Sequence, residues 1–142
     1  MSKQLIDITK VVTAFSPVDC NTAPTEDWVS LKNADRVTII LQCGTLAGGT
    51  GCVITLKQAT AVAGTGEKEL AFSYVYQKEG TLTTSSTLTK TTVTSNTFTA
   101  GTSSSIYVIE IRASELDVDN GFDCVRVDVA GTSGDRDWET HS

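Results

Sequence analysis

The sequence contains a single histidine, His141, which is the residue before the last. Chain ends are commonly poorly ordered, whereas a Ser-His-Asp or Cys-His mechanism needs its histidine held beside the nucleophile. Zinc sites of mixed cysteine and histidine are also disfavoured, because the four cysteines show no C-x-x-C spacing. We therefore predict no catalytic residues, no metal site and no cofactor, and we expect a protein that is not an enzyme.

Long apolar runs and an excess of basic charge are also missing. No apolar stretch approaches the roughly 18 residues that span a bilayer, and none follows the first residues as in a secretion signal. We therefore predict no membrane association and expect synthesis in a cytosol. Seventeen acidic against eleven basic side chains give a net charge of -6, which is the wrong sign for neutralising phosphates. We predict no nucleic-acid partner.

Two short segments look like ligand-binding loops but depart from the required patterns. In residues 117–123, Gly121 comes one position too early for a calcium loop, and no glutamate closes a twelve-residue loop. The glycine-rich residues 44–51 lead into a predicted strand, whereas a phosphate-binding loop opens a helix. We interpret the first segment as a polar turn and the second as a hairpin tip.

Prolines are also scarce, at two, and β-branched residues are abundant, which favours strands. We predict one domain over residues 1–142, an all-β antiparallel sandwich or barrel-like fold with little helix. Residues 37–43 and 52–58 are predicted to pair as a hairpin with Cys43 opposite Cys52. In this register Leu41 faces Ile54 and Ile39 faces Leu56, so all six side chains share one apolar face.

Three further segments show the alternation of half-buried strands. In residues 70–76 the aromatic side chains share a face and are predicted to lie in the core. Residues 106–112 place apolar side chains opposite two charged ones, and residues 122–129 place three valines on one face. The predicted inward residues of the three segments are Leu70, Phe72, Tyr74, Tyr76, Tyr107, Ile109, Ile111, Val125, Val127 and Val129. A helical turn at 113–117, capped by Ser114, is expected before the last segment.

Residues 81–105 have a distinct composition, since seventeen of the twenty-five are serine or threonine. We predict an exposed edge strand or long hairpin here, and a disordered linker is the alternative. A flexible tail is expected at 131–142.

The four cysteines are Cys20, Cys43, Cys52 and Cys124. Reduced, packed thiols are expected in a cytosol. A bond between Cys43 and Cys52 would require Cα atoms within about 7 Å. Cys20 lies in a predicted loop and Cys124 on the more polar face of its strand, so these two are predicted to meet a neighbouring subunit. Trp28 is expected to pack under a loop, with an interface contact as the alternative.

Five segments carry a resemblance to a known family. They are Lys10 to Asp19 (KVVTAFSPVD), Asp27 to Asn33 (DWVSLKN), Ile54 to Ala59 (ITLKQA), Val62 to Gly66 (VAGTG) and Glu115 to Val127 (ELDVDNGFDCVRV). In these segments, which span most of the chain, the sequence resembles small structural proteins of tailed-phage virions. The Ser/Thr-rich segment and residues 134–142 depart from the family pattern.

The resemblance implies a non-enzymatic head decoration (cement) protein on the capsid surface, made in the host cytoplasm. Its expected partners are the major capsid protein and further copies of itself, with a trimer as the expected oligomer. Oxidation after particle release would then link neighbouring copies through Cys20 or Cys124. One alternative is a head-to-tail connector or tail-associated protein.

A second alternative is a receptor- or glycan-binding module that uses aromatic side chains as stacking platforms. The candidates are Trp28, Tyr74, Tyr76 and Tyr107. The alternation that places the tyrosines in the core argues against this alternative.

Overall fold

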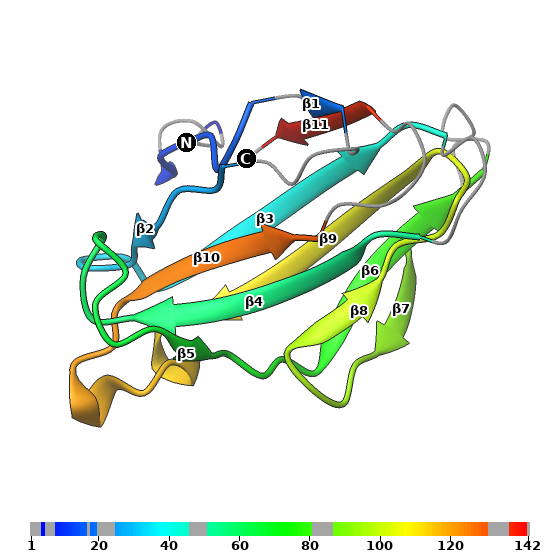
Figure 1. The fold of residues 1–142 in the computed structure, drawn as a ribbon. Coiled ribbons are helices and arrows are strands. Elements are labelled where there is room, and N and C mark those ends of the chain that lie inside the picture. Colours follow the sequence, from blue (N-terminus) through cyan, green and yellow to red (C-terminus); the bar gives the residue numbers. More distant parts are fainter. Residues whose placement is uncertain are drawn as a thin grey trace.

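The fold is an antiparallel β-sandwich of two sheets with two short 3-10 turns (Figure 1), which confirms the all-β prediction. The computed structural model describes residues 4, 8–16, 18–19, 25–45, 51–80, 87–130 and 137–141. Within 18–19 and 137–141 it describes the strands without their side chains.

One sheet has six strands and the other has five. The six-stranded sheet runs, in spatial order, β1 (Val18–Asp19), β11 (Asp137–His141), β3 (Arg36–Cys43), β9 (Ser105–Arg112), β6 (Tyr74–Glu79) and β7 (Thr89–Thr92). The five-stranded sheet runs β2 (Val29–Ser30), β10 (Cys124–Val129), β4 (Val53–Ala59) and β5 (Lys68–Glu69), and β8 (Thr97–Thr99) also pairs with β4.

The core lies between the two sheets. Alternate residues of each long strand point inward, so that β9 buries Tyr107, Ile109 and Ile111 while Glu110 and Arg112 stay exposed, as predicted. On β10 the predicted inward valines, Val125, Val127 and Val129, are likewise buried. Each fully buried aliphatic side chain contributes about 1.5–3 kcal/mol.

The predicted hairpin of residues 37–43 and 52–58 is wrong. β3 pairs with β9 and β11, whereas β4 pairs with β10 in the other sheet. Leu41 and Ile54 are both fully buried, but they enter the core from opposite sheets. Alternation determines which side of a strand is apolar and leaves its hydrogen-bonded neighbour undetermined.

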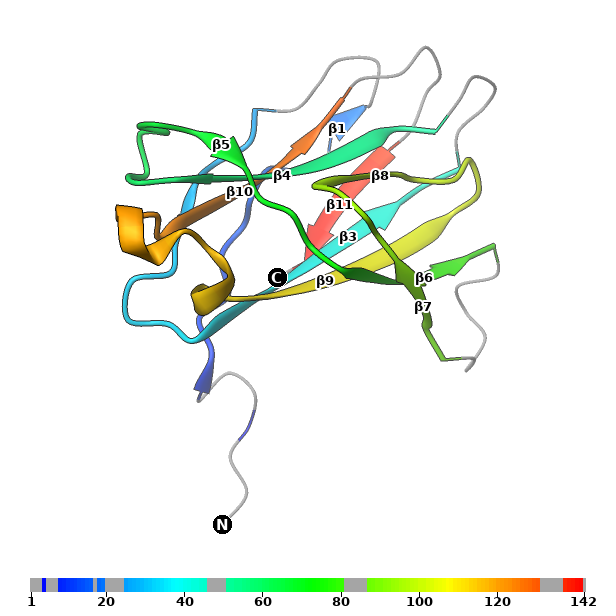
Figure 2. The same cartoon turned by 90° about the horizontal axis from the view of Figure 1, so that it is seen from below.

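The predicted strand at 70–76 is also corrected, because the chain changes sheet within it. Leu70 and Phe72 are buried, but β6 begins at Tyr74 and turns Val75 inward. Figure 2 shows the chain crossing between the layers from β5 to β6. Tyr74, 45% exposed, and the half-buried Tyr76 therefore lie on the outer face, and their predicted place in the core is wrong.

The helical turn predicted at 113–117 corresponds to η1 (Ala113–Glu115), which is followed by η2 (Val118–Asn120). The predicted cap, Ser114, is not the capping residue. Instead the Arg112 backbone N–H donates to the Glu115 carboxylate at 2.8 Å. A carboxylate accepts this hydrogen bond more strongly than a neutral hydroxyl would.

The Ser/Thr-rich segment contributes to both sheets. β7 is the edge strand beside β6, whereas β8 lies against β4. The Phe98 ring packs against Phe72 and Tyr107, with centroids 6.1 and 5.2 Å apart. Residues 81–86 of this segment, and 131–136 and 142 of the predicted tail, lie outside the described residues, while 137–141 form β11 on β3.

Candidate functional site

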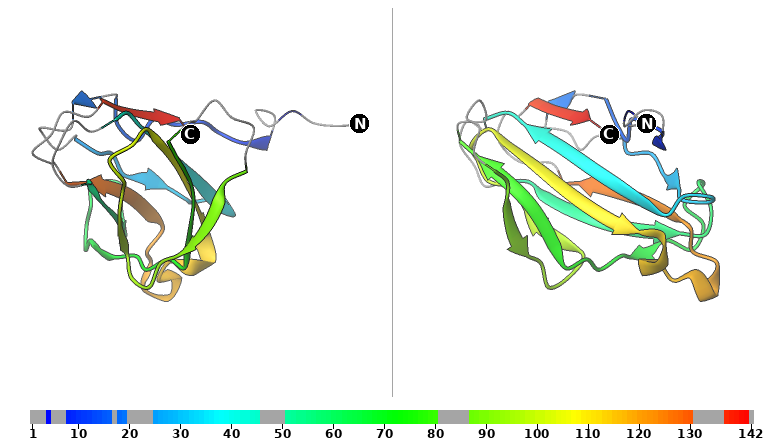
Figure 3. Two further views of the ribbon diagram at one scale, coloured as in Figure 1. Left: turned by 90° about the vertical axis from the view of Figure 1, so that its right-hand side faces the viewer. Right: turned by 180° about the vertical axis from the view of Figure 1, so that it is seen from behind.

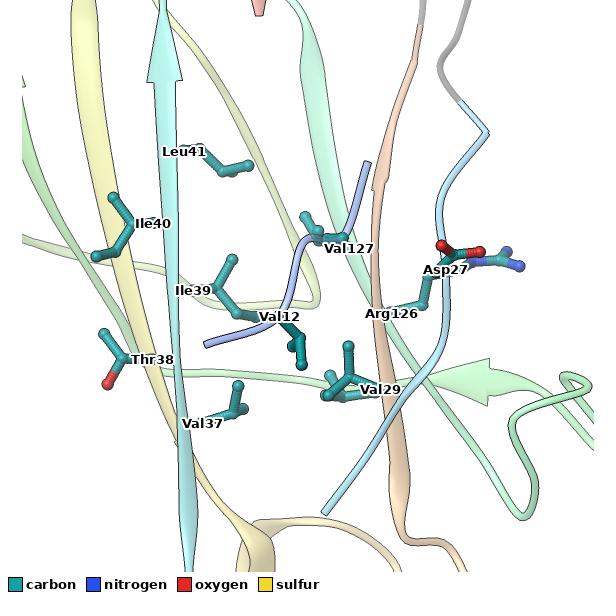
Figure 4. Close-up of a pocket in the computed structure, with 12 residues that line it drawn as sticks. Val12, Asp27, Val29, Val37, Thr38, Ile39, Ile40, Leu41, Arg126 and Val127 are labelled. Atoms are coloured by element: carbon teal, nitrogen blue, oxygen red, sulfur yellow. The ribbon is translucent and has the colours of Figure 1, made fainter. Parts of the chain in front are cut away.

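A small cavity lies between the sheets where β3 faces β10 (Figure 4). Its walls are mostly aliphatic, and the N-terminal segment contributes Val12 and Ala14. The volume is about 40 Å³, whereas small-molecule sites are usually about 300–1,000 Å³. The cavity is therefore a packing defect of the core rather than a ligand site. The figure also shows Leu41 directed from β3 toward the cavity and Ile40 directed away from it.

A network of four charged side chains covers the outer face of the five-stranded sheet. Lys57 and Arg126 are directly opposite one another on β4 and β10, an arrangement that by itself is destabilising. Asp128 and Glu67 compensate, because the Lys57 ammonium lies 3.1 Å from Glu67 and 3.2 Å from Asp128. These two carboxylates raise the pKa of Lys57. We call these four residues the charge network.

Arg126 completes the charge network. Its guanidinium donates two hydrogen bonds to the Asp128 carboxylate and lies 3.5 Å from Glu67. Both cations thus contact both carboxylates, so the network is neutral within this one chain. Asp128 raises the pKa of the guanidinium further.

Trp28 packs beside this network. The Arg126 guanidinium lies 4.6 Å from the indole ring, a cation–π contact. On the turn that follows β4, Gly64 has φ +81°, and a Cβ atom there would approach the indole nitrogen to 2.8 Å. Trp28 is half-buried beside this turn, and the alternative of an interface contact stays a prediction.

Glu26 connects the segment before β2 to the end of β10. Its carboxylate accepts a hydrogen bond of 2.9 Å from the Val129 backbone N–H. Burial raises the pKa of this carboxyl, and the neighbouring Asp128 raises it further, against the opposing effect of the hydrogen bond to Val129. Ionised Glu26 is therefore slightly unfavourable in the folded protein.

Cys43, Cys52 and Cys124 are buried, reduced thiols in the structure. Cys124 does lie on the side of β10 opposite Val125, as predicted, but it is only 2% exposed between Ser30 on β2 and Ala59 on β4. Burial raises the pKa of its thiol to about 11. This burial argues against the predicted contact of Cys124 with a neighbouring subunit, which stays a prediction. Cys20 lies outside the described residues.

Tyr107 is the tyrosine that the sequence places correctly in the core. Its hydroxyl donates to the Glu79 carboxylate at 2.5 Å and accepts from the Gly101 backbone N–H at 2.7 Å. Burial and the Glu79 carboxylate raise the pKa of the phenol to about 12. The side chain is fully buried and is not a stacking platform.

Hydrogen bonds attach the polar turn predicted at 117–123 to β4 and β5. The Asp117 carboxylate accepts hydrogen bonds from Lys68 and Asn120, and these lower its pKa. Lys68 also lies 4.1 Å from the Phe122 ring. Among the described residues no group of three potential metal ligands occurs. Asp117, the first residue of this turn, thus holds the turn in place.

The outer face of the six-stranded sheet is apolar at its centre. The strand register places Ile40, Val108, Tyr76 and Lys90 side by side on β3, β9, β6 and β7. We call these four residues the outer row. Ile40, Val108 and Tyr76 are half-buried. The right-hand view of Figure 3 shows no other described element over the middle of β3, β9 and β6.

Lys90, at the β7 end of this row, lies over aromatic rings. Its ammonium lies 3.8 Å from the centroid of the Tyr74 ring and 6.0 Å from that of Tyr76. Within the described part of the chain, Lys90 forms no ion pair with a carboxylate, in contrast to Lys57 and Lys68. The outer row therefore combines aliphatic, aromatic and uncompensated cationic groups.

No protein-family model, no curated protein and no solved structure matches this chain. In the described ranges no helix is long and apolar enough to cross a membrane.

Proposed function

We propose that this chain is a non-enzymatic structural protein of a tailed-phage particle, specifically a decoration protein that binds the major capsid protein and stabilises the head. The resemblance described for the sequence suggests this role. The structural observation that carries the proposal is the outer row, because solvent-facing apolar patches on soluble domains commonly mark binding sites for other proteins. A decoration protein functions through such a surface rather than through a pocket.

The rest of the molecule suits a rigid attachment. Two sheets pack through a continuous apolar core, and the charge network is compensated within the chain. A body of this kind presents the outer row without rearranging, which keeps the entropic cost of association low. The proposal also includes self-association into a trimer, in which each copy contacts its neighbouring copies and the capsid subunits.

The copy number and location of the protein in purified particles test the proposal. Quantitative mass spectrometry gives the ratio to the major capsid protein, and electron cryo-microscopy gives the position. Many copies spread over the shell would support decoration. A single ring at one vertex would support a head-to-tail connector instead, and absence from the particle would refute a virion role.

A glycan- or receptor-binding module is the second candidate, because Tyr74 and Tyr76 lie on the outer face rather than in the core. Tyrosine rings exposed in this way can stack on sugars. One argument against it is that Lys90 already covers the Tyr74 ring. Binding on a glycan array that is lost in both Tyr74→Ala and Tyr76→Ala, and kept in Trp28→Ala, would favour this candidate at the outer row.

A further inference from the structure

We infer that the outer row is the docking face, and that its partner is a capsid-protein surface with an apolar centre and carboxylates at its rim. This inference rests on the proposed function and specifies the partner of that function. It is carried by three properties of the row: its continuity, its charge, and its contrast with the opposite face of the sandwich.

The row is continuous across four neighbouring strands. Strands in a sheet lie about 4.8 Å apart, so four of them span roughly 14 Å. Ile106, half-buried and paired with Lys78, extends the apolar surface along β9. Of these side chains Tyr76 is of a type enriched at interface hot spots, where a few large residues supply most of the binding energy.

The charge at the β7 end of the row points to an acidic partner. The whole chain carries a net charge of -6, yet Lys90 is exposed on this face and forms no ion pair with a carboxylate of the described residues. On the same face, Arg36 and Glu110 compensate one another at 2.6 Å, so they add no net charge. The surface presented to a partner is thus apolar with a positive margin.

A second copy of this chain fits this surface poorly. A two-fold contact buries the same patch on both subunits, so the apolar row of one copy would meet the row of the other with the Lys90 ammonium groups on the same buried surface. Like charges brought together in an interface oppose binding. A different protein that offers carboxylates avoids this repulsion.

The experiment compares the two outer faces with matched lysine substitutions. Val108→Lys places a charge in the middle of the outer row, and Val53→Lys places one at a 40% exposed position on the outer face of the other sheet. Particles assembled without the protein are mixed with each purified variant, and co-sedimentation measures the affinity. We expect wild type and Val53→Lys to bind alike. Val108→Lys should bind at least tenfold more weakly, which corresponds to about 1.4 kcal/mol.

Charge reversal gives a second test that does not depend on the tolerance of β9 to substitution. Lys90 is exposed, so Lys90→Glu keeps the fold, and Lys32→Glu in the exposed turn after β2 is its control. We expect Lys90→Glu to weaken particle binding, with a difference from wild type that shrinks as salt is added. Lys32→Glu should bind as wild type does.

The outcomes separate the inference from the proposed function. If wild type binds and both Val108→Lys and Lys90→Glu bind equally well, the docking face is elsewhere, although the decoration role stands. If wild type does not bind particles at all, both are refuted. If wild type fails to bind but self-associates in solution, and Val108→Lys remains monomeric, the row is an interface between copies and the inference of a capsid partner is overturned.

Discussion

The two outer faces of the sandwich are built from the same alternation, but they differ in what their side chains contact. On the five-stranded sheet, Lys57 and Arg126 contact carboxylates of their own chain. On the six-stranded sheet, the corresponding positions hold aliphatic and tyrosine side chains and the exposed Lys90. On the five-stranded face these described charges are thus compensated within the molecule, whereas on the six-stranded face Arg36 and Glu110 compensate one another but Lys90 has no described ion-pair partner.

This difference separates residues that stabilise the fold from residues that are available for binding. The charge network joins β4, β10 and the turn before β5, so removing one member leaves one sign of charge in excess among the remaining three. The outer row joins β3, β9, β6 and β7 through side chains that are only half-buried. We therefore expect substitutions in the charge network to lower stability, and substitutions in the outer row to lower partner binding.

The largest expected effect comes from comparing two neighbours on β9. Ile109 is fully buried between the sheets, whereas Val108 belongs to the outer row. Ile109→Ala should lower the free energy of unfolding by about 2–5 kcal/mol, because it removes buried methyl groups and leaves a cavity. Val108→Ala should lower it by about 1 kcal/mol or less. Urea unfolding followed by tryptophan fluorescence measures both values.

Equal costs for the two β9 substitutions would contradict this comparison. They would mean that Val108 is covered in the folded protein, so that the outer row would be part of a second core rather than a surface. Circular dichroism of both variants before unfolding serves as the control for an unchanged strand content.

Much of this fold could be predicted from the sequence, because a strand with one polar face shows by its alternation which of its sides is buried. On this basis the inward valines of residues 122–129 are predicted correctly, and so are the inward residues of 106–112, where the charged Glu110 and Arg112 mark the outer side. Strand partners could not be predicted. The side chains of 37–43 and 52–58 satisfy either a hairpin or two facing sheets equally well, since both arrangements bury the same residues.

The outer row could not be predicted from the sequence, for a related physical reason. Thr38 to Leu41 carries apolar residues on both faces, and so does Ile106 to Ile109, ahead of the charged residues of β9. Within these short segments alternation alone does not say which residue is in the core. That two-sided apolar character was the available signal, since a half-solvated antiparallel strand usually has one polar face. For Tyr74 the error had another origin, because the chain changes sheets just before β6.

The next largest effect is expected in the charge network. Arg126→Ala removes a guanidinium that is bonded to Asp128, near Glu67, and stacked on Trp28. We expect a loss of about 1–2 kcal/mol in the free energy of unfolding, because hydrogen bonds between charged groups stabilise more than neutral ones. Urea unfolding at low and high salt measures it, and the loss should be smaller at high salt.

A salt-independent loss would contradict an electrostatic origin and would assign the effect to the stacking on Trp28 alone. Arg126→Lys separates the two contributions, since it keeps the charge but not the planar fork. This variant should recover only part of the lost stability.

A smaller effect on stability is expected for Lys90, the cation of the outer row on the six-stranded sheet. Lys90→Ala removes the contact with the Tyr74 ring, and an exposed cation–π contact contributes about 0.5–1 kcal/mol. Because Lys90 pairs with no carboxylate in the described part of the chain, the loss should not exceed that range. Thermal unfolding of Lys90→Ala beside Arg126→Ala checks the order, and a larger loss for Lys90→Ala would contradict the assignment of stability to the charge network.

The smallest effect concerns Glu26, whose pKa is raised in the folded protein chiefly by burial. A carboxyl group with a raised folded pKa disfavours folding while it is ionised, and the folded state gains stability as the pH falls through that pKa. Glu26→Gln removes the charge, and the amide oxygen still accepts from the Val129 N–H. We therefore expect a small gain in melting temperature at neutral pH that disappears once the pH has fallen through the raised pKa and the wild-type carboxyl is protonated in both the folded and the unfolded states. A loss of stability at neutral pH would mean that the charged hydrogen bond to Val129 outweighs the cost of burial. The ionised carboxylate would then stabilise the fold, as the charge network does.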